Sequence, residues 1–296
     1  MCALVKTRNQ LILNAVYFDT NIFDHIHKGI RVTPDDVQFL KQRVRDGRLS
    51  ILSSIINLEE ILMLASGDRD LAVAELQLID ELVDCNHILK PFHQLIDEDV
   101  TAYAQGTTLP LPLTEFPHAA RETIEFLRNS GTTNMQELIG EIREQIDTFR
   151  ANMREGGNQV RPIARQIRME DIPTFEQYWN DLSISFAEAY AERSGQLSAC
   201  RARGIEGLLQ LRSVRLSIGV SLALTYAQTY GLERRAAERR EPQQGDSRDL
   251  QHALTASATR VFVTHDPKFA RLLKCVPVSD FNVLTLPEFL DSIRSN

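Results

Sequence analysis

One short stretch near the start of the chain constrains the fold most: Ala15-Val16-Tyr17-Phe18-Asp19-Thr20-Asn21. Apolar and aromatic residues run directly into a carboxylate, a hydroxyl and an amide. This pattern is typical of a buried strand that delivers polar side chains to the edge of a sheet. In open α/β sheets, ligands bind outside the carboxyl ends of the strands, so we expect Asp19 to lie where chemistry occurs.

Further along, short apolar runs alternate with amphipathic helical patterns, which predicts βαβ units and parallel strand pairing. The predicted strands span residues 15–18, 49–52, 87–89, 261–263 and 281–284. The expected fold class is therefore α/β, with a parallel five-stranded sheet sandwiched by helices.

The middle of the chain has a different character. Residues 105–117 contain a glycine and several prolines, which indicates a linker or an irregular loop. Helical patterns follow at residues 119–128, 135–153, 175–191 and 208–226, with a predicted break at 155–171. We therefore expect a discontinuous α/β core, residues 1–104 and 245–296, interrupted by a mainly α-helical insertion, residues 105–244.

Composition excludes several classes of protein. The net charge of −7 argues against a general polyanion-binding protein driven by bulk charge. No apolar run approaches the roughly 20 residues needed to cross a bilayer, so we expect no membrane span and a cytoplasmic location. The four cysteines form no CxxC pair, which argues against a zinc ribbon or a thiol redox motif.

Basic residues nevertheless gather locally in the second half of the chain. Solvated helix faces and contact with phosphate groups explain such a cluster equally well. The arginines concerned are Arg201, Arg203, Arg212, Arg215, Arg234, Arg235, Arg239 and Arg240.

Acidic residues are predicted at one edge of the sheet. Asp19 and Asp266 each end an apolar strand, whereas Glu60 and Asp249 lie near the starts of neighbouring helices. Clustered carboxylates repel one another, and a divalent cation such as Mg²⁺ or Mn²⁺ removes that penalty. For each acid alone, a role as a helix cap or as a surface acid near a helix terminus is the better explanation. Four acids at separately derived positions of one edge are harder to assign to chance.

These segments resemble the motifs of the PIN-domain (PilT N-terminus) family. Tyr17-Phe18-Asp19-Thr20-Asn21 is similar to the first motif, and Ser54 to Leu62 to the second. Asp249 to Ala258 resembles the third motif and Val261 to Phe269 the fourth. The resemblance covers roughly residues 13–104 and 245–290. The long helical middle departs from it, because a typical PIN domain is much shorter.

The resemblance implies a set of metal ligands, with Mg or Mn as the cofactor. Carried over motif by motif, the ligands are Asp19, Glu60, Asp249 and Asp266. Glu59 and Asp246 are the alternatives for the second and third acids. Thr20, Asn21 and Thr264 match polar positions that orient acids or water.

The resemblance also implies a function: a metal-dependent endoribonuclease whose products carry 5′-phosphate and 3′-hydroxyl ends. Several bacterial members are toxins of toxin–antitoxin pairs, so an antitoxin protein is an expected partner beside the RNA substrate. Three roles are open for the helical insertion: to cover the active site, to form a homodimer, or to hold RNA through the arginines.

Other functions compete with this one. His25, His252 and His265 are candidates for metal-free general acid–base cleavage, which would yield cyclic phosphates. A phosphatase of the haloacid dehalogenase type requires a second aspartate where this chain has Asn21. A non-catalytic PIN scaffold would instead bind RNA or protein through its helical insertion.

Overall fold

The computed structural model describes residues 15–83, 86–164, 171–230, 246–274, 276 and 281–295. Its strands are β1 (Ala15–Phe18), β2 (Ser50–Leu52), β3 (His87–Leu89), β4 (Leu113–Glu115), β5 (Val261–Val263) and β6 (Asn282–Leu284). The helices of the first half are α2 (Thr20–Lys28), α3 (Pro34–Arg45), α4 (Ile55–Leu64), α5 (Arg69–Leu82), α6 (Phe92–Gln105) and α7 (Ala119–Asn129). Those of the second half are α8 (Thr132–Ala164), α9 (Phe175–Arg193), α10 (Leu197–Arg203), the 3-10 helix η2 (Ile205–Gln210), α11 (Arg212–Tyr230), α12 (Asp246–Ala256), α13 (Pro267–Lys274) and α14 (Leu286–Arg294).

A four-stranded parallel sheet with the order β2-β1-β5-β6 lies at the centre of the molecule. The chain is thus α/β, as the alternating pattern predicts. β1 is an inner strand: Tyr17 pairs with Leu52 on one side and with Phe262 on the other. The pairing continues past the end of β1, since the Asp19 amide donates to the Val263 carbonyl at 3.0 Å. Asp19 is therefore fixed at the carboxyl edge.

The predicted strand at residues 87–89 is present, but it is placed differently. β3 pairs with β4 in an antiparallel two-stranded sheet, and β4 lies within residues 105–117, where an irregular loop was expected. β3 touches the edge of the larger sheet through a parallel bridge between Leu89 and Ser54. The sequence predicted a loop here because prolines flank the short strand β4, and prolines are typical of loops.

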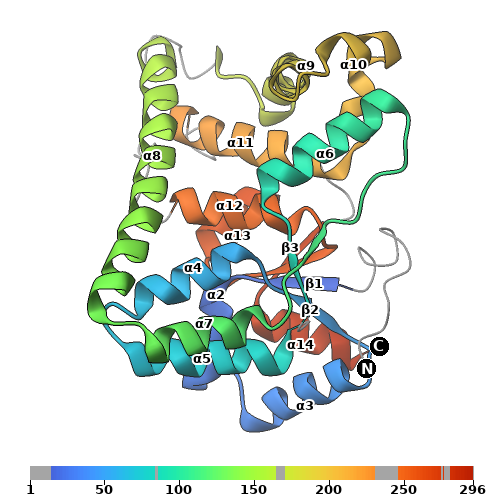
Figure 1. Cartoon of the computed structure of the whole chain (residues 1–296). Coiled ribbons are helices and arrows are strands. Elements are labelled where there is room, and N and C mark those ends of the chain that lie inside the picture. Colours follow the sequence, from blue (N-terminus) through green and yellow to red (C-terminus); the bar gives the residue numbers. More distant parts are fainter. Residues whose placement is uncertain are drawn as a thin grey trace.

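Alternating side chains of the strands divide the core between the two faces of the sheet. Val16, Phe18 and Val263 belong to a cluster that includes residues of α2, α4, α5, α7 and α14. Tyr17 and Phe262 point to the other face, where α11, α12 and α13 cover them. Figure 1 shows these helices above and below the sheet. The sheet is therefore buried on both faces, as the continuous apolar sequence of β1 requires.

The helical middle of the chain packs directly on this core. Ile124 and Leu127 of α7 and Ile142 of α8 belong to the same cluster as Val16. The predicted break at residues 155–171 was placed too early, because α8 continues to Ala164 and runs along one side of the molecule (Figure 1). Helices α6, α9, α10 and α11 form a separate cluster farther from the sheet. Among the described residues, no helix is long and apolar enough to cross a membrane.

Candidate metal centre

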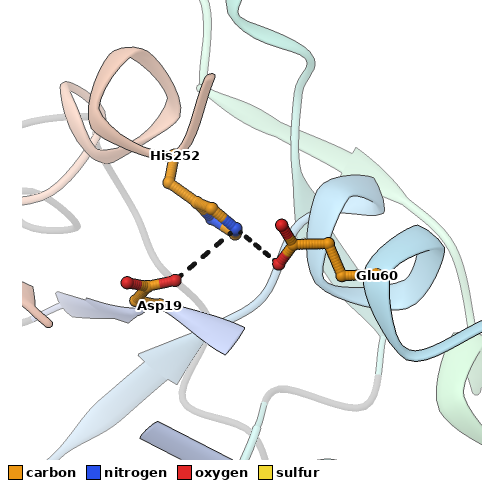
Figure 2. Close-up of side chains that lie close together, drawn as sticks. All are labelled: Asp19, Glu60 and His252. Carbon is orange, nitrogen blue, oxygen red and sulfur yellow. Dashed lines mark hydrogen bonds and ion pairs between the residues drawn. The ribbon is translucent and has the colours of Figure 1, made fainter. Parts of the chain in front are cut away.

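Three side chains from separate elements converge at the carboxyl edge of the sheet. Asp19 follows β1, Glu60 lies in α4, and His252 lies in α12. One ligand atom from each lies within 4.8 Å of the other two, which makes this a group that could hold a metal ion. Figure 2 shows both carboxylates directed toward the imidazole. Two of the four predicted acids are therefore in contact with one histidine.

Asp19 is held in place by hydrogen bonds to one carboxylate oxygen. Asn21 Nδ2 donates to Asp19 Oδ2 at 2.8 Å, and Thr264 Oγ1 donates to the same oxygen at 2.7 Å. The other oxygen, Oδ1, faces His252 Nε2 at 3.6 Å. Although Asp19 directly precedes α2, its side chain makes no N-cap hydrogen bond, so capping does not account for it. Asn21 and Thr264 thus orient the acid, the role that the sequence motifs imply for them.

The imidazole of His252 lies between the two acids. Its Nε2 is 2.9 Å from Glu60 Oε2, and Thr20 Oγ1 lies 3.4 Å from the same nitrogen. The residue is only 1% exposed, whereas the side chain of Glu60 is 21% exposed. The site is therefore buried at the histidine and open to solvent at Glu60.

The pKa values of Asp19, Glu60 and His252 are shifted by burial and by the charges of one another. Burial raises the pKa of Asp19; the neighbouring imidazole opposes this shift, and the charge of Glu60 adds to it. Burial would also raise the pKa of Glu60, but the charge and hydrogen bond of His252 bring it below its usual value. Burial disfavours a charged His252, yet the carboxylates of Glu60 and Asp19 outweigh it and raise the histidine pKa. Positive charge is thus stabilised between these acids.

The other predicted acids lie around this group. Burial, followed by the charges of Asp19 and Asp266, raises the pKa of Asp249 to about 7. Asp249 is therefore electrostatically coupled to the same edge. One oxygen of Asp266 accepts a hydrogen bond from the Phe269 amide at 2.9 Å, so Asp266 also caps α13. The side chain of Asp246 lies outside the described part of the chain.

Adjacent glutamates on α4 have different partners. Glu60 contacts His252, whereas Glu59 Oε2 lies 2.7 Å from Nη1 of Arg248. The guanidinium also binds Gln251 at 2.9 Å and is largely buried. Glu60 therefore faces the centre, whereas Glu59 pairs with a largely buried arginine.

The sequence pattern indicates His252 as a candidate general acid or base, but it does not reveal the contact of this residue with β1. The Tyr17 hydroxyl lies 2.6 Å from His252 Nδ1 and 2.7 Å from Ser54 Oγ. Tyr17 is fully buried, and its pKa is raised well above the usual value, chiefly by burial. One local signal was available: Asp249 and His252 are three residues apart and share a helix face.

The other predicted histidines form a pair of their own. The rings of His25 and His265 stack with their centroids 4.0 Å apart. Burial, together with electrostatic interactions with His25 and Arg31, lowers the pKa of His265 to about 4. Its ring nitrogens have no hydrogen-bond partner among the described residues. His265 is thus neutral near pH 7, beside rather than within the carboxylate group.

Several arginines of the predicted basic cluster make contacts within the protein. Arg201 pairs with Glu188 at 2.8 Å, Arg203 stacks over the ring of Tyr103, and Arg212 donates to the carbonyls of Ser257 and Thr259. Arg215 also lies among the described residues, whereas Arg234, Arg235, Arg239 and Arg240 lie outside them. The described arginines Arg201, Arg203 and Arg212 therefore have structural contacts of their own.

The donor set suits a divalent cation. Two carboxylates that would otherwise repel face one imidazole nitrogen, and these ligand types bind Mn²⁺ and other divalent metals. The carboxylates lie beyond the ends of parallel strands, the usual position of ligand sites in open α/β sheets. No protein-family model, no curated protein and no solved structure matches this chain.

Proposed function

We propose that the chain is a metal-dependent endoribonuclease with a PIN-like core. The observation that carries the proposal is the convergence of Asp19, Glu60 and His252 at the carboxyl edge of the parallel sheet. The ordered sequence motifs that place Asp19, Glu60, Asp249 and Asp266 at that edge support it. β3, bridged to the β2 side through Leu89 and Ser54, would supply the fifth strand.

In this proposal Asp19, Glu60 and His252 hold the metal, Mg²⁺ or Mn²⁺. When bound, such an ion activates water and stabilises the charge of an in-line phosphoryl displacement. Asn21 and Thr264 keep Oδ1 of Asp19 directed toward the centre by binding Oδ2. The exposed side of Glu60 is where the RNA phosphodiester would approach.

Asp249 and Asp266 complete the acidic edge. Their charges raise the local negative potential, as the coupling of Asp249 to Asp19, Asp266 and Glu60 indicates. This potential attracts a cation and repels bare RNA, so metal loading should precede RNA binding. An antitoxin protein and a second copy of the chain are the further partners that this proposal allows.

A metal-dependent cleavage assay tests the proposal. Full-length protein should cleave RNA with Mg²⁺ or Mn²⁺ and lose activity with a chelator. Asp19→Asn should reduce cleavage by roughly 100-fold or more, since several kcal/mol of charge stabilisation depend on the metal. Asp97→Asn is the matched control, because Asp97 lies in a half-exposed pair with Arg193. Unchanged cleavage by Asp19→Asn would refute the proposal.

One observation favours a second candidate function. The hydrogen bond between His252 and Glu60 is the arrangement of a general acid–base pair that needs no metal. The almost complete burial of His252 weighs against it, because the ring must reach a reacting proton. Cleavage that persists in chelator and yields cyclic phosphates would support this mechanism. RNA binding without turnover in any metal would instead support a scaffold.

A further inference from the structure

A chain of buried hydrogen bonds connects His252 to β1 and α4. Tyr17 contacts both His252 Nδ1 and Ser54 Oγ, and Ser54 Oγ lies 3.2 Å from Asn57 Oδ1. Asn57 Nδ2 lies 3.1 Å from the Phe18 carbonyl and 3.1 Å from Thr20 Oγ1. The chain thus begins on the backbone of β1 and ends at the imidazole.

The direction of these hydrogen bonds follows from their fixed ends. The Phe18 carbonyl can only accept, so the amide nitrogen of Asn57 faces it. The Ser54 backbone amide can only donate, so Asn57 Oδ1 faces Ser54 at 2.9 Å. The orientation of the Asn57 side chain is therefore determined on both sides.

The remaining protons are then assigned in turn. Ser54 gives its single hydroxyl proton to Asn57 Oδ1 and accepts from Tyr17. Tyr17, having donated to Ser54, accepts from the Nδ1–H of His252. Nε2 donates to Glu60 Oε2 when the imidazole is charged. When that proton leaves, the neutral imidazole keeps its proton on Nδ1 and has its lone pair on Nε2, the atom that faces Asp19 and Glu60.

We propose that Nε2 of His252 is a metal ligand positioned by Tyr17, and that the site therefore prefers a first-row transition cation such as Mn²⁺ to Mg²⁺. The inference rests on the metal centre of the proposed function and deepens it. Mg²⁺ requires a near-ideal octahedral shell of oxygens and dehydrates reluctantly, whereas imidazole nitrogen suits transition metals. Groups that orient a ligating histidine typically contribute 10–100-fold to metal affinity.

The test measures metal binding to the full-length protein, separately from RNA cleavage. Mn²⁺ affinity is measured by electron paramagnetic resonance, and Mg²⁺ affinity by competition. Tyr17→Phe keeps the ring and removes the hydroxyl, so Mn²⁺ should bind roughly 10–100-fold more weakly while Mg²⁺ affinity changes less. His252→Gln should reduce the preference for Mn²⁺ further.

Tyr190→Phe is the matched control, because its hydroxyl lies 2.6 Å from Ser217 Oγ between α9 and α11. It should bind Mn²⁺ like the wild type. A spin-echo spectrum of bound Mn²⁺ supplies a readout that a purely structural role would not change. Coupling to an imidazole ¹⁴N should be present in the wild type and in Tyr190→Phe, and absent in His252→Gln.

The outcomes separate this inference from the proposed function. Bound Mn²⁺ without nitrogen coupling, or equal losses for Tyr17→Phe and Tyr190→Phe, would overturn the inference even if RNA is cleaved. Nitrogen-coupled, Mn²⁺-selective binding without RNA cleavage would uphold it and refute the ribonuclease. Absence of any metal binding would overturn both. If Tyr17→Phe fails to fold, the wild-type and His252→Gln spectra still decide the result.

Discussion

Two groups of acidic side chains in this molecule place like charges close together at buried positions, and they differ in the groups that surround the acids. At the sheet edge, Asp19 and Glu60 share the imidazole of His252, and Asn21 and Thr264 donate to Asp19. Between α2 and α5, Glu75 faces Asp24. That second pair has Lys28 nearby, 2.5 Å from Asp24, and Oε1 of Glu75 has no partner among the described atoms.

The two groups differ in what opposes burial. At the sheet edge, the imidazole and the Thr264 hydroxyl counteract the burial that raises the pKa of Asp19, and His252 brings the pKa of Glu60 below its usual value. Between α2 and α5, burial and then the charge and hydrogen bond of Asp24 raise the pKa of Glu75 to about 7. Glu75 thus tends to hold a proton. A set of fixed donors, more than the presence of acids, distinguishes the candidate centre.

The largest expected effect is on RNA cleavage, and it should differ between substitutions of the two neighbouring glutamates of α4. Glu60→Gln should reduce metal-dependent RNA cleavage by roughly 100-fold or more, because it removes an ionised ligand. Glu59→Gln should leave cleavage nearly unchanged but lower the free energy of unfolding by about 1–3 kcal/mol, because Arg248 loses its anionic partner. Cleavage rates and urea denaturation of both variants check this. Equal effects of the two substitutions on cleavage would contradict the assignment.

The next largest effect is on the stability of the protein and arises from Glu75, the buried acid that faces Asp24 between α2 and α5. Glu75 has a pKa of about 7 in the native state, above its ordinary value of 4.5. The native state thus retains a proton that the unfolded chain has lost, so stability falls as the pH rises from about 4.5 to about 7. Glu75→Gln should make this decline shallower, with the contribution of Asp249 remaining, and should stabilise the protein at about pH 8 by about 1–3 kcal/mol.

Urea denaturation at about pH 5 and about pH 8 measures the change in stability of Glu75→Gln. Glu81→Gln, an exposed acid of the same helix paired with Lys41, is the control. The control should follow the wild-type pH dependence. If Glu75→Gln loses stability with pH as steeply as the wild type, the raised pKa of Glu75 does not contribute.

The smallest expected effect lies at an exposed ion pair. Arg201 and Glu188 are both substantially exposed, and water screens their attraction. Arg201→Ala should change the free energy of unfolding by less than about 1 kcal/mol, as measured by thermal or urea denaturation. A larger loss would mean that this arginine stabilises the helical region beyond its pairing with Glu188.

Local sequence patterns predicted the parts of the site that depend on neighbouring residues. The apolar run of β1 followed by Asp19, and that of β5 followed by Thr264, placed both residues at the carboxyl edge, where they are hydrogen-bonded to each other. A helix start near Asp249 was also predicted, and the helix found there, Asp246–Ala256, carries Asp249 and His252. A strand that ends in a polar residue can be predicted from the sequence, because the pattern depends only on neighbouring residues.

The rest of the site depends on contacts between distant residues. Tyr17 and His252 are 235 positions apart, and a tyrosine within an apolar strand looks like ordinary core. The prolines around β4 concealed a strand that forms only against β3. The glycines within α8 indicated a helix end, although intrinsic propensity is a weak guide where tertiary packing intervenes.

We propose that the carboxylates around His252 support metal-dependent hydrolysis of RNA. Analysis of the product ends tests it most directly, with purified full-length protein in Mn²⁺, in Mg²⁺ and in chelator. The metal reactions should yield 5′-phosphate and 3′-hydroxyl ends, and no cleavage should occur in chelator. Cyclic phosphate products that form equally in chelator would contradict it.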